Sequence, residues 1–382
     1  MNDKFIESVS FIKSKFPNQN FIPLHEPRFQ GNEKKYLNDA IDSTFVSSIG
    51  AYVNKFEDMM CDITGAKYAI ATANGTSALH LALLVAGVKR EDEVLTQSLT
   101  FIATANAISY IGASSVFLDV DKDTMGMSPV ALQNYLSEFA DKKEGQAFSK
   151  VSGKRIRACV PMHTFGFPCR TKKLAIICKE WGIILVEDTA ESIGSYHNGV
   201  HTGLDGLVSA FSFNGNKTVT CGGGGALITN DEKVAKLAKH LSTQAKIPHP
   251  YEFRHDHIGY NYRMPNLNAA LACAQLEQLP QYLVSKRKLA AEYATFFKEV
   301  GVNFVTEPEG SQASYWLNCL LFDNKDERNE FLDYANKNGV MSRPAWELMH
   351  TLDMFKDAHK GDMTNSEWIT DRLVNIPSSV IQ

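Results

Sequence analysis

The stretch from Ile183 to Gly225 decides the fold and indicates the chemistry. It begins Ile-Ile-Leu-Val-Glu-Asp188-Thr-Ala-Glu191, continues after a gap as Ala-Phe-Ser212-Phe-Asn-Gly-Asn-Lys217, and ends Thr-Val-Thr-Cys-Gly-Gly-Gly-Gly225. An aspartate ends one apolar strand, and a lysine follows a second strand 29 positions later. In parallel sheets, ligands bind outside the carboxyl ends of the strands. We therefore expect Asp188 and Lys217 to lie in one site.

A lysine and a buried carboxylate in this arrangement suit pyridoxal phosphate (PLP). The amine of Lys217 would form a Schiff base with the cofactor aldehyde, and Asp188 beside the ring nitrogen would keep that nitrogen protonated. Taken singly, a lysine in a turn is usually a solvent-exposed charge and an aspartate after a strand is often a helix cap. Together they predict amine chemistry.

Three further positions fit the same cofactor. Asn74-Gly75-Thr76-Ser77 joins a strand to a helix, and the first N–H groups of that helix would bind a phosphate. The hydroxyl of Ser212 could donate to the same phosphate, and Phe101, after another strand, could stack on the exposed ring face. Ordinary helix capping and ordinary core packing are the alternative interpretations of these residues.

Composition bounds the class of protein. The chain has 382 residues, 44% of them hydrophobic and 21% charged, with a formal charge of -4. This length favours two domains, and the absence of basic excess argues against a nucleic-acid partner. No signal peptide or membrane-spanning run is expected. The seven cysteines are odd in number and scattered, which favours free thiols in a reducing cytoplasm over disulfides. No metal site is predicted, since a set of Cys159, His163 and Cys169 is the weaker interpretation.

Alternation of short apolar runs with helical stretches predicts an α/β fold with a mostly parallel seven-stranded sheet, covered by helices on both faces. The strands are expected at 68–72, 93–96, 115–120, 157–162, 183–187, 207–211 and 226–229. The polar segment 141–154 is expected to be a surface excursion. Residues 1–248 would form a large PLP-binding domain with an N-terminal segment. Residues 249–382 would form a smaller α+β domain, with separate helices over 266–278 and 280–300.

Four ordered motifs resemble the DegT/DnrJ/EryC1/StrS family of sugar aminotransferases. They are Asn-Gly-Thr-Ser-Ala-Leu-His-Leu-Ala-Leu (74–83), Glu-Asp-Thr-Ala-Glu-Ser-Ile-Gly (187–194), Ser-Phe-Asn-Gly-Asn-Lys (212–217) and Gly-Tyr-Asn-Tyr-Arg-Met (259–264). The resemblance runs from Phe21 to Ser379. It implies the fold type I architecture of aspartate aminotransferase, in a homodimer whose active sites lie at the subunit interface.

The resemblance also implies roles by position. Lys217 is the Schiff-base lysine and Asp188 the partner of the ring nitrogen. Gly75, Thr76 and Ser212 bind phosphate, Phe101 stacks on the ring, and Asn261 reaches the phosphate of the neighbouring subunit. Glu191 stands where many members have Gln or His near the ring hydroxyl, which leaves its protonation open.

Three segments look like the LegC subgroup of that family: 24–29 (Leu-His-Glu-Pro-Arg-Phe), 42–48 (Asp-Ser-Thr-Phe-Val-Ser-Ser) and 342–350 (Ser-Arg-Pro-Ala-Trp-Glu-Leu-Met-His). The expected reaction moves an amino group, by analogy from L-glutamate, to C4 of a UDP- or GDP-linked 2-acetamido-4-keto-6-deoxy hexose, towards legionaminic-acid-type surface sugars. One alternative is a perosamine-type enzyme with no preference for the acetamido group. The other is a non-enzymatic nucleotide-sugar sensor.

Overall fold

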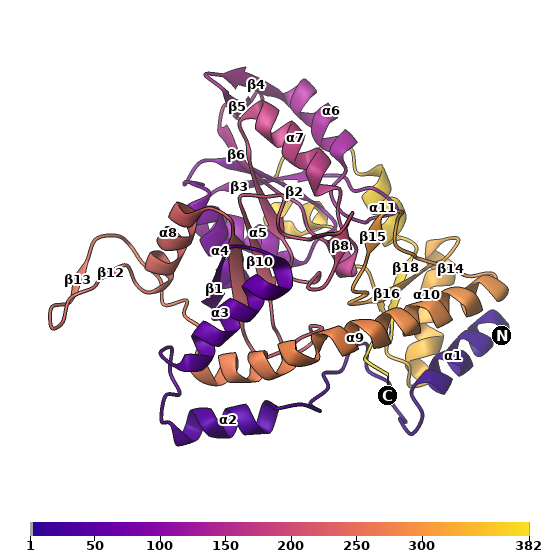
Figure 1. Ribbon diagram of the computed structural model, residues 1–382. Helices are drawn as coiled ribbons and strands as arrows, with labels where there is room; N and C mark the ends of the chain where they lie inside the picture. The colour runs from indigo at the N-terminus through magenta and orange to yellow at the C-terminus, as the bar shows by residue number, and fades with distance from the viewer. Residues whose placement is uncertain (1–2, 382) are drawn as a thin grey trace.

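A twisted sheet between two layers of helices forms the centre of the computed structural model, which describes residues 3–381 (Figure 1). Its main path has the order β1-β11-β10-β7-β6-β2-β3. These strands are β1 (Tyr68–Thr72), β2 (Glu93–Gln97), β3 (Ser114–Leu118), β6 (Arg155–Val160), β7 (Ile184–Asp188), β10 (Val208–Ser212) and β11 (Gly225–Thr229). Six of the seven run in one direction and β11 is antiparallel to both neighbours. The predicted mostly parallel α/β sheet is confirmed.

The polar segment 141–154 was expected to be a simple excursion, and this expectation is wrong in part. The segment contributes a hairpin of β4 (Ala140–Lys143) and β5 (Gln146–Ser149), and β5 pairs with β6, so the sheet has nine strands. Glu144 and Gly145 form the turn, with φ of 50° and 76°. Two successive positive φ values suit the tight turn of a hairpin, whose polar strands tolerate an edge position.

Both faces of the sheet are covered by apolar packing. The helices, in chain order, are α1 (Asp3–Lys15), α2 (Glu33–Asp42), α3 (Ala51–Thr64), α4 (Gly75–Val85), α5 (Ile102–Ile111), α6 (Pro129–Phe139), α7 (Thr171–Trp181), α8 (Glu232–Ser242), α9 (Asn266–Glu299), α10 (Lys325–Lys337) and α11 (Thr364–Thr370). Along β11, Leu227 packs with α4 and α8, whereas Ala226 and Ile228 pack with α3 and the first half of α9. Successive side chains of a strand point to opposite faces, so this strand must be apolar throughout.

Helix α9 corrects the expectation of two helices divided at Pro280. It is a single helix of 34 residues with Pro280 inside it. The proline ring is exposed, and its missing N–H removes only one bond of the helix. The first half of α9 is buried against the large sheet, and the second half carries Leu289, Tyr293 and Phe297 into a second core. Packing at both ends therefore favours one continuous helix.

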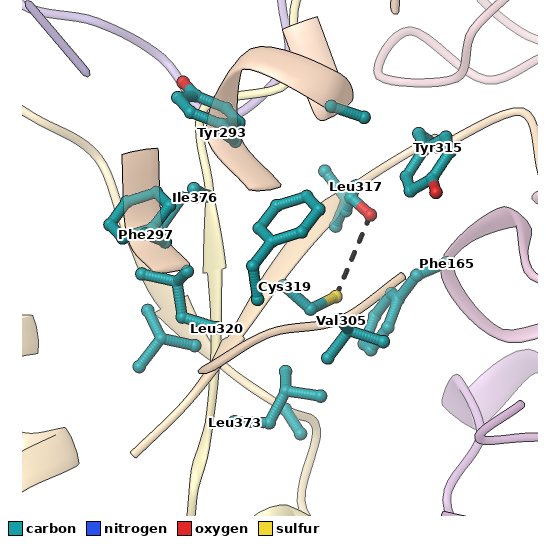
Figure 2. Close-up of a cluster of buried hydrophobic side chains, with 14 of the residues drawn as sticks. Phe165, Tyr293, Phe297, Val305, Tyr315, Leu317, Cys319, Leu320, Leu373 and Ile376 are labelled. Carbon is teal, nitrogen blue, oxygen red and sulfur yellow. Dashed lines mark hydrogen bonds between the residues drawn. The ribbon is translucent and has the colours of Figure 1, made fainter. Parts of the chain in front are cut away.

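The second core surrounds a four-stranded antiparallel sheet of order β14-β16-β18-β17. Its strands are β14 (Asn303–Phe304), β16 (Asn318–Leu321), β17 (Arg343–Pro344) and β18 (Leu373–Ile376). Figure 2 shows Leu320 and Ile376 beside Phe297 of α9, and Leu373 belongs to the same core. Figure 1 places α1 beside the far end of α9, and its Phe5 belongs to this core. The division of the chain at residue 248 stays a prediction: α1 lies before it but packs in the second core, and the first half of α9 lies after it but packs against the large sheet.

The short strands outside these two sheets are β8 (Tyr196–His197), β9 (Val200–His201), β15 (Ser311–Gln312), β12 (Lys246–Ile247) and β13 (Arg254–His255). The hairpin of β12 and β13 projects away from the rest of the chain (Figure 1). No helix within residues 3–381 is both long and apolar enough to traverse a bilayer.

Candidate active site

Asp188 is the last residue of β7 and is only 2% exposed. Thr104, near the start of α5, donates a hydrogen bond from Oγ1 to Oδ2 of Asp188 at 2.7 Å, and the Ala190 N–H donates to Oδ1 at 3.1 Å. Burial raises the pKa of Asp188, and these hydrogen bonds oppose that rise. The carboxyl group is therefore fixed in orientation at the carboxyl end of the sheet, where the sequence predicted a ligand.

Lys217 lies in the loop between β10 and β11, and its side chain is 12% exposed. Its Nζ donates to Oε1 of Glu191 at 3.1 Å. The same nitrogen lies 3.9 Å from the centre of the Trp316 ring. A carboxylate and an aromatic face thus hold the amine in place on two sides.

Glu191 is 3% exposed and uses both of its oxygens. Besides Lys217, it accepts a hydrogen bond from the Phe165 N–H to Oε2 at 2.8 Å. Burial raises the pKa of Glu191 to about 7, although the charge of Lys217 acts in the opposite direction. Near neutral pH this carboxyl group therefore exists in both protonation states.

The strand register brings the predicted phosphate-binding residues together. Thr72, at the end of β1, pairs with Gly225, and Gly225 also pairs with Ser212 at the end of β10. The chain therefore leaves β1 close to Ser212. Gly75 then begins α4 against Ser212: a Cβ atom on Gly75 would lie 2.7 Å from the Ser212 Cβ. The Asn74 side chain caps the helix by accepting from the Ser77 N–H at 2.8 Å.

This arrangement leaves a cradle suited to an anion. The N–H groups of Gly75 and Thr76 belong to the first turn of α4, so they have no acceptor within the helix. The hydroxyl of Ser212 lies beside them, as a Gly75 Cβ would be 3.0 Å from it. Backbone N–H groups at a helix N-terminus bind phosphate. The residues present therefore fit the phosphate, the ring nitrogen and the aldehyde of PLP.

Phe101 stays close to this site but is not buried in the core. It precedes α5 and is 48% exposed, with only an edge contact to Trp346 at a ring distance of 6.0 Å. An exposed ring in this position is available to stack on a planar cofactor. Its stacking role stays a prediction.

Asn261 is exposed and lies in the segment that returns from the β12–β13 hairpin, where it pairs with Thr243. The structure contains one chain, so its predicted contact with the phosphate of a partner stays a prediction.

His163 does not join Cys159 and Cys169 in a metal site, because both of its ring nitrogens are occupied. Nε2 lies 2.9 Å from Oε2 of Glu187, and Nδ1 accepts from the Cys169 N–H at 3.0 Å. His163 therefore connects the end of β7, through Glu187, with the backbone of Cys169.

Trp316 and Thr104 are site residues that the sequence did not reveal. Trp316 precedes β16 of the second core, about 100 residues after Lys217, and its Nε1–H donates to the Asn216 carbonyl at 2.8 Å. Thr104 is an ordinary helix residue whose role depends on the packing of α5 beside β7.

The fold and this site together define a PLP-dependent enzyme of fold type I. The model of the DegT/DnrJ/EryC1/StrS aminotransferase family matches residues 27–380, and the chain belongs to that family. Enzymes of the family depend on PLP, so the predicted cofactor and the prediction of an enzyme rather than a sensor are confirmed.

Two known proteins are similar to this chain in sequence, and one solved structure is similar to it in fold. A GDP-perosamine synthase of Escherichia coli O157:H7 is 35% identical over 358 residues, covering 94% of this chain and 93% of that protein. A GDP-perosamine synthase of Vibrio cholerae is 34% identical over 360 residues and covers 94% of each chain. The crystal structure of the aminotransferase TlmJ from Streptoalloteichus hindustanus aligns with a TM-score of 0.85 at 24% identity, covering 94% of this chain and 93% of that one.

Proposed function

We propose that this enzyme transfers an amino group from L-glutamate to C4 of a nucleotide-linked 4-keto-6-deoxy hexose. One observation carries the proposal: Lys217 Nζ is held between Glu191 and the Trp316 ring, at the same carboxyl-terminal edge of the sheet as buried Asp188 and the Gly75–Ser212 cradle. The chain belongs to an aminotransferase family, and the relatives named GDP-perosamine synthase support a sugar as the acceptor. The donor and the exact sugar are proposals.

Each residue has a definite task in this reaction. When bound, PLP supplies an electron sink that acidifies the carbon bearing the amino group. Lys217 would move one proton on Nζ in each half-reaction: from the donor's amino-bearing carbon to the cofactor carbon in the first, and from that cofactor carbon to C4 of the sugar in the second. Asp188 would hold the proton on the ring nitrogen, and its fixed hydrogen bonds to Thr104 and Ala190 keep it aligned. Gly75, Thr76 and Ser212 would anchor the phosphate.

Glu191 assists Lys217 by its position. The carboxylate accepts a hydrogen bond from Nζ at 3.1 Å, which fixes the position of the amine in the site. Because burial raises the pKa of Glu191 to about 7, the group can also carry a proton and donate a hydrogen bond. The role near the ring hydroxyl that the family resemblance implies is compatible with either state.

The homodimer is supported by exposed apolar side chains in two regions, the connection between α2 and α3 and the hairpin segment that precedes Asn261. Their exposed fractions range from 56% to 86%, and the residues are Phe45, Ile49, Tyr251, Phe253 and Ile258. Clustered exposed apolar groups mark interaction surfaces. In our proposal a second copy covers them, and Asn261 of each subunit reaches the phosphate in the other. Catalysis in the cytoplasm stays a prediction, as does the absence of a nucleic-acid partner.

A 2-acetamido sugar is our first candidate substrate. Two of the LegC-like segments border the site: the backbone of 24–26 bonds to Ser378 and Ser379, and Trp346 of 342–350 contacts both Phe165 and Phe101. This placement supports a role of the LegC-like segments in binding the sugar. The second candidate is the perosamine-type substrate with a free hydroxyl at C2, supported by the two relatives named GDP-perosamine synthase.

Kinetic comparison of four substrates separates the candidates. We expect amination of UDP- or GDP-linked 4-keto-6-deoxy sugars with glutamate, and kcat/KM with and without the 2-acetamido group identifies the preferred class. Transfer to none of the four sugars would overturn the proposed function.

Lys217→Ala tests the mechanism. We expect loss of at least about 1,000-fold in kcat with an unchanged fold by circular dichroism, because no other group in the proposal moves the proton. Borohydride reduction of the PLP-loaded wild type, followed by peptide mass mapping, should place the label on Lys217. Near-normal turnover of the variant, or a label on another lysine, would contradict the assignment.

A further inference from the structure

His25 is a polar side chain beside the site that no step of the proposed reaction uses. It lies between α1 and α2, in the N-terminal segment of the chain. Both ring nitrogens are buried, and neither has a hydrogen-bond partner among residues 3–381. Buried polar groups in native proteins are nearly always hydrogen-bonded, so a partner is missing from the isolated chain.

The backbone on each side of His25 is held firmly. The carbonyl of Leu24 accepts a hydrogen bond from the Ser378 N–H at 2.8 Å. The N–H of Glu26 donates to Oγ of Ser379 at 2.8 Å. The imidazole is therefore presented from a fixed position, and its unpaired nitrogens do not result from a loose segment.

The C-terminal segment that contains Ser378 and Ser379 also connects His25 to the catalytic lysine. Lys286, fully buried on α9, donates from Nζ to the carbonyl of Ser378 at 2.5 Å and to that of Trp316 at 3.3 Å. The ring of Trp316 in turn lies under Lys217 Nζ. The N-terminal segment around His25, the C-terminal segment with Ser378 and Ser379, and the site are thus joined through consecutive contacts.

The positive charges in and around the site also affect the pKa of His25. Burial lowers the pKa of His25 well below its usual value, and the positive charges of Lys286, Lys217 and Arg28 lower it further. The imidazole is therefore neutral at neutral pH. A neutral imidazole offers one N–H donor and one nitrogen acceptor.

That donor–acceptor pair selects among the possible ligands. A carboxylate or diphosphate supplies acceptors alone and would leave one nitrogen of a neutral ring unpaired. A sugar hydroxyl or a secondary amide supplies both a donor and an acceptor. We propose that His25 binds the sugar of the keto-sugar substrate through a hydroxyl or acetamido group and so contributes to sugar specificity, an inference that rests on the proposed function.

Two substitutions at this position test the inference. His25→Leu removes both polar groups at similar volume, whereas His25→Gln keeps one donor and one acceptor. We expect His25→Leu to raise KM for the keto sugar about 10- to 100-fold, because the sugar group then loses its partner. Amino transfer from glutamate to the enzyme, measured alone in a single turnover, should change less than about twofold. His25→Gln should restore much of the sugar affinity.

The matched control is Gln30→Leu, which removes an exposed polar side chain from the same segment. Binding of UDP- and GDP-linked keto sugars to wild type and variants, followed by tryptophan fluorescence, provides a readout independent of turnover. Comparing the 2-acetamido and 2-hydroxy sugars shows which group His25 binds. The loss of affinity in His25→Leu should be larger for the sugar whose group His25 contacts.

Several results would overturn the inference. It is wrong if His25→Leu binds both sugars as the wild type does, or if it weakens glutamate transfer as much as sugar binding. It is also wrong if His25→Gln behaves like His25→Leu while both remain folded. A wild type that accepts the amino group from glutamate yet aminates no sugar would instead overturn the proposed function, and the fluorescence comparison would still decide the role of His25.

Discussion

At the scale of single residues, Asp188 depends on burial and on two hydrogen bonds for its function. Asp188→Asn keeps the shape and can still accept from Thr104, but a neutral amide cannot hold a proton on the ring nitrogen. We expect kcat to fall on the order of 100-fold or more, with little change in folding. Single-turnover kinetics should show the loss in the proton-transfer step. Asp58→Asn, at an exposed position, is the control, and a variant rate within a few-fold of wild type would exclude the electron-sink role.

Glu191 makes the stability of the cofactor-free enzyme depend on pH. Its folded-state pKa is about 7, above the ordinary 4.5, so the folded chain binds this proton more tightly than the unfolded chain does. The stabilisation is fully present below about pH 4.5 and is lost as pH rises through about 7. We expect the difference in unfolding free energy between wild type and Glu191→Gln to fall by about 3 kcal/mol over that range.

Denaturant titrations at a series of pH values measure this difference. Glu330→Gln, on an exposed face of α10, should show no such trend. A difference for Glu191→Gln that stays constant from acid to neutral pH would show that the carboxyl group titrates normally.

At the scale of elements, the start of α4 must lie directly against the end of β10. Gly75→Ala would place a methyl group 2.7 Å from the Ser212 Cβ, so the helix must move away from the strand. We expect PLP affinity to fall at least about tenfold, because the N–H groups of the first turn lose their alignment. Equilibrium dialysis measures the affinity. Gly361→Ala, where a methyl group meets only ordinary contacts at 3.6 Å and beyond, should leave it unchanged; equal affinities for the two variants would count against the cradle.

At the scale of the whole molecule, the shared site can be tested by mixing subunits. If Asn261 serves the partner's site, a hybrid of a Lys217→Ala subunit with an Asn261→Ala subunit has one site with both defects and one intact site. Unfolding and refolding an equal mixture should therefore restore roughly a quarter of the wild-type activity, since half of the dimers are hybrids and each has one working site. Each variant refolded alone provides the control. No gain on mixing, with dimers shown by sedimentation, would place Asn261 in its own subunit's site.

Local pattern was sufficient for much of the fold. All seven predicted strands exist within two residues of their expected ends, because strands covered on both faces must be continuously apolar. The end of helix α7 is also marked locally, because Gly182 follows its last residue and adopts the left-handed conformation of a helix C-cap. The division of α9 failed because Pro280 disfavours a helix locally, whereas the two cores that hold its halves are distant in sequence.

The sequence by itself determined the reactive groups and their order along the chain: the lysine, the aspartate at a strand end, and the glycine-led helix. Chemistry of this kind resides in residue type and local spacing, and both can be read in one dimension. Only the tertiary structure decided what surrounds them. Trp316 under the lysine and Thr104 on Asp188 come from segments more than 80 residues away from their partners in the chain, and the unpaired ring of His25 comes from the N-terminal segment. Their positions follow from the packing of two cores, which no local pattern encodes.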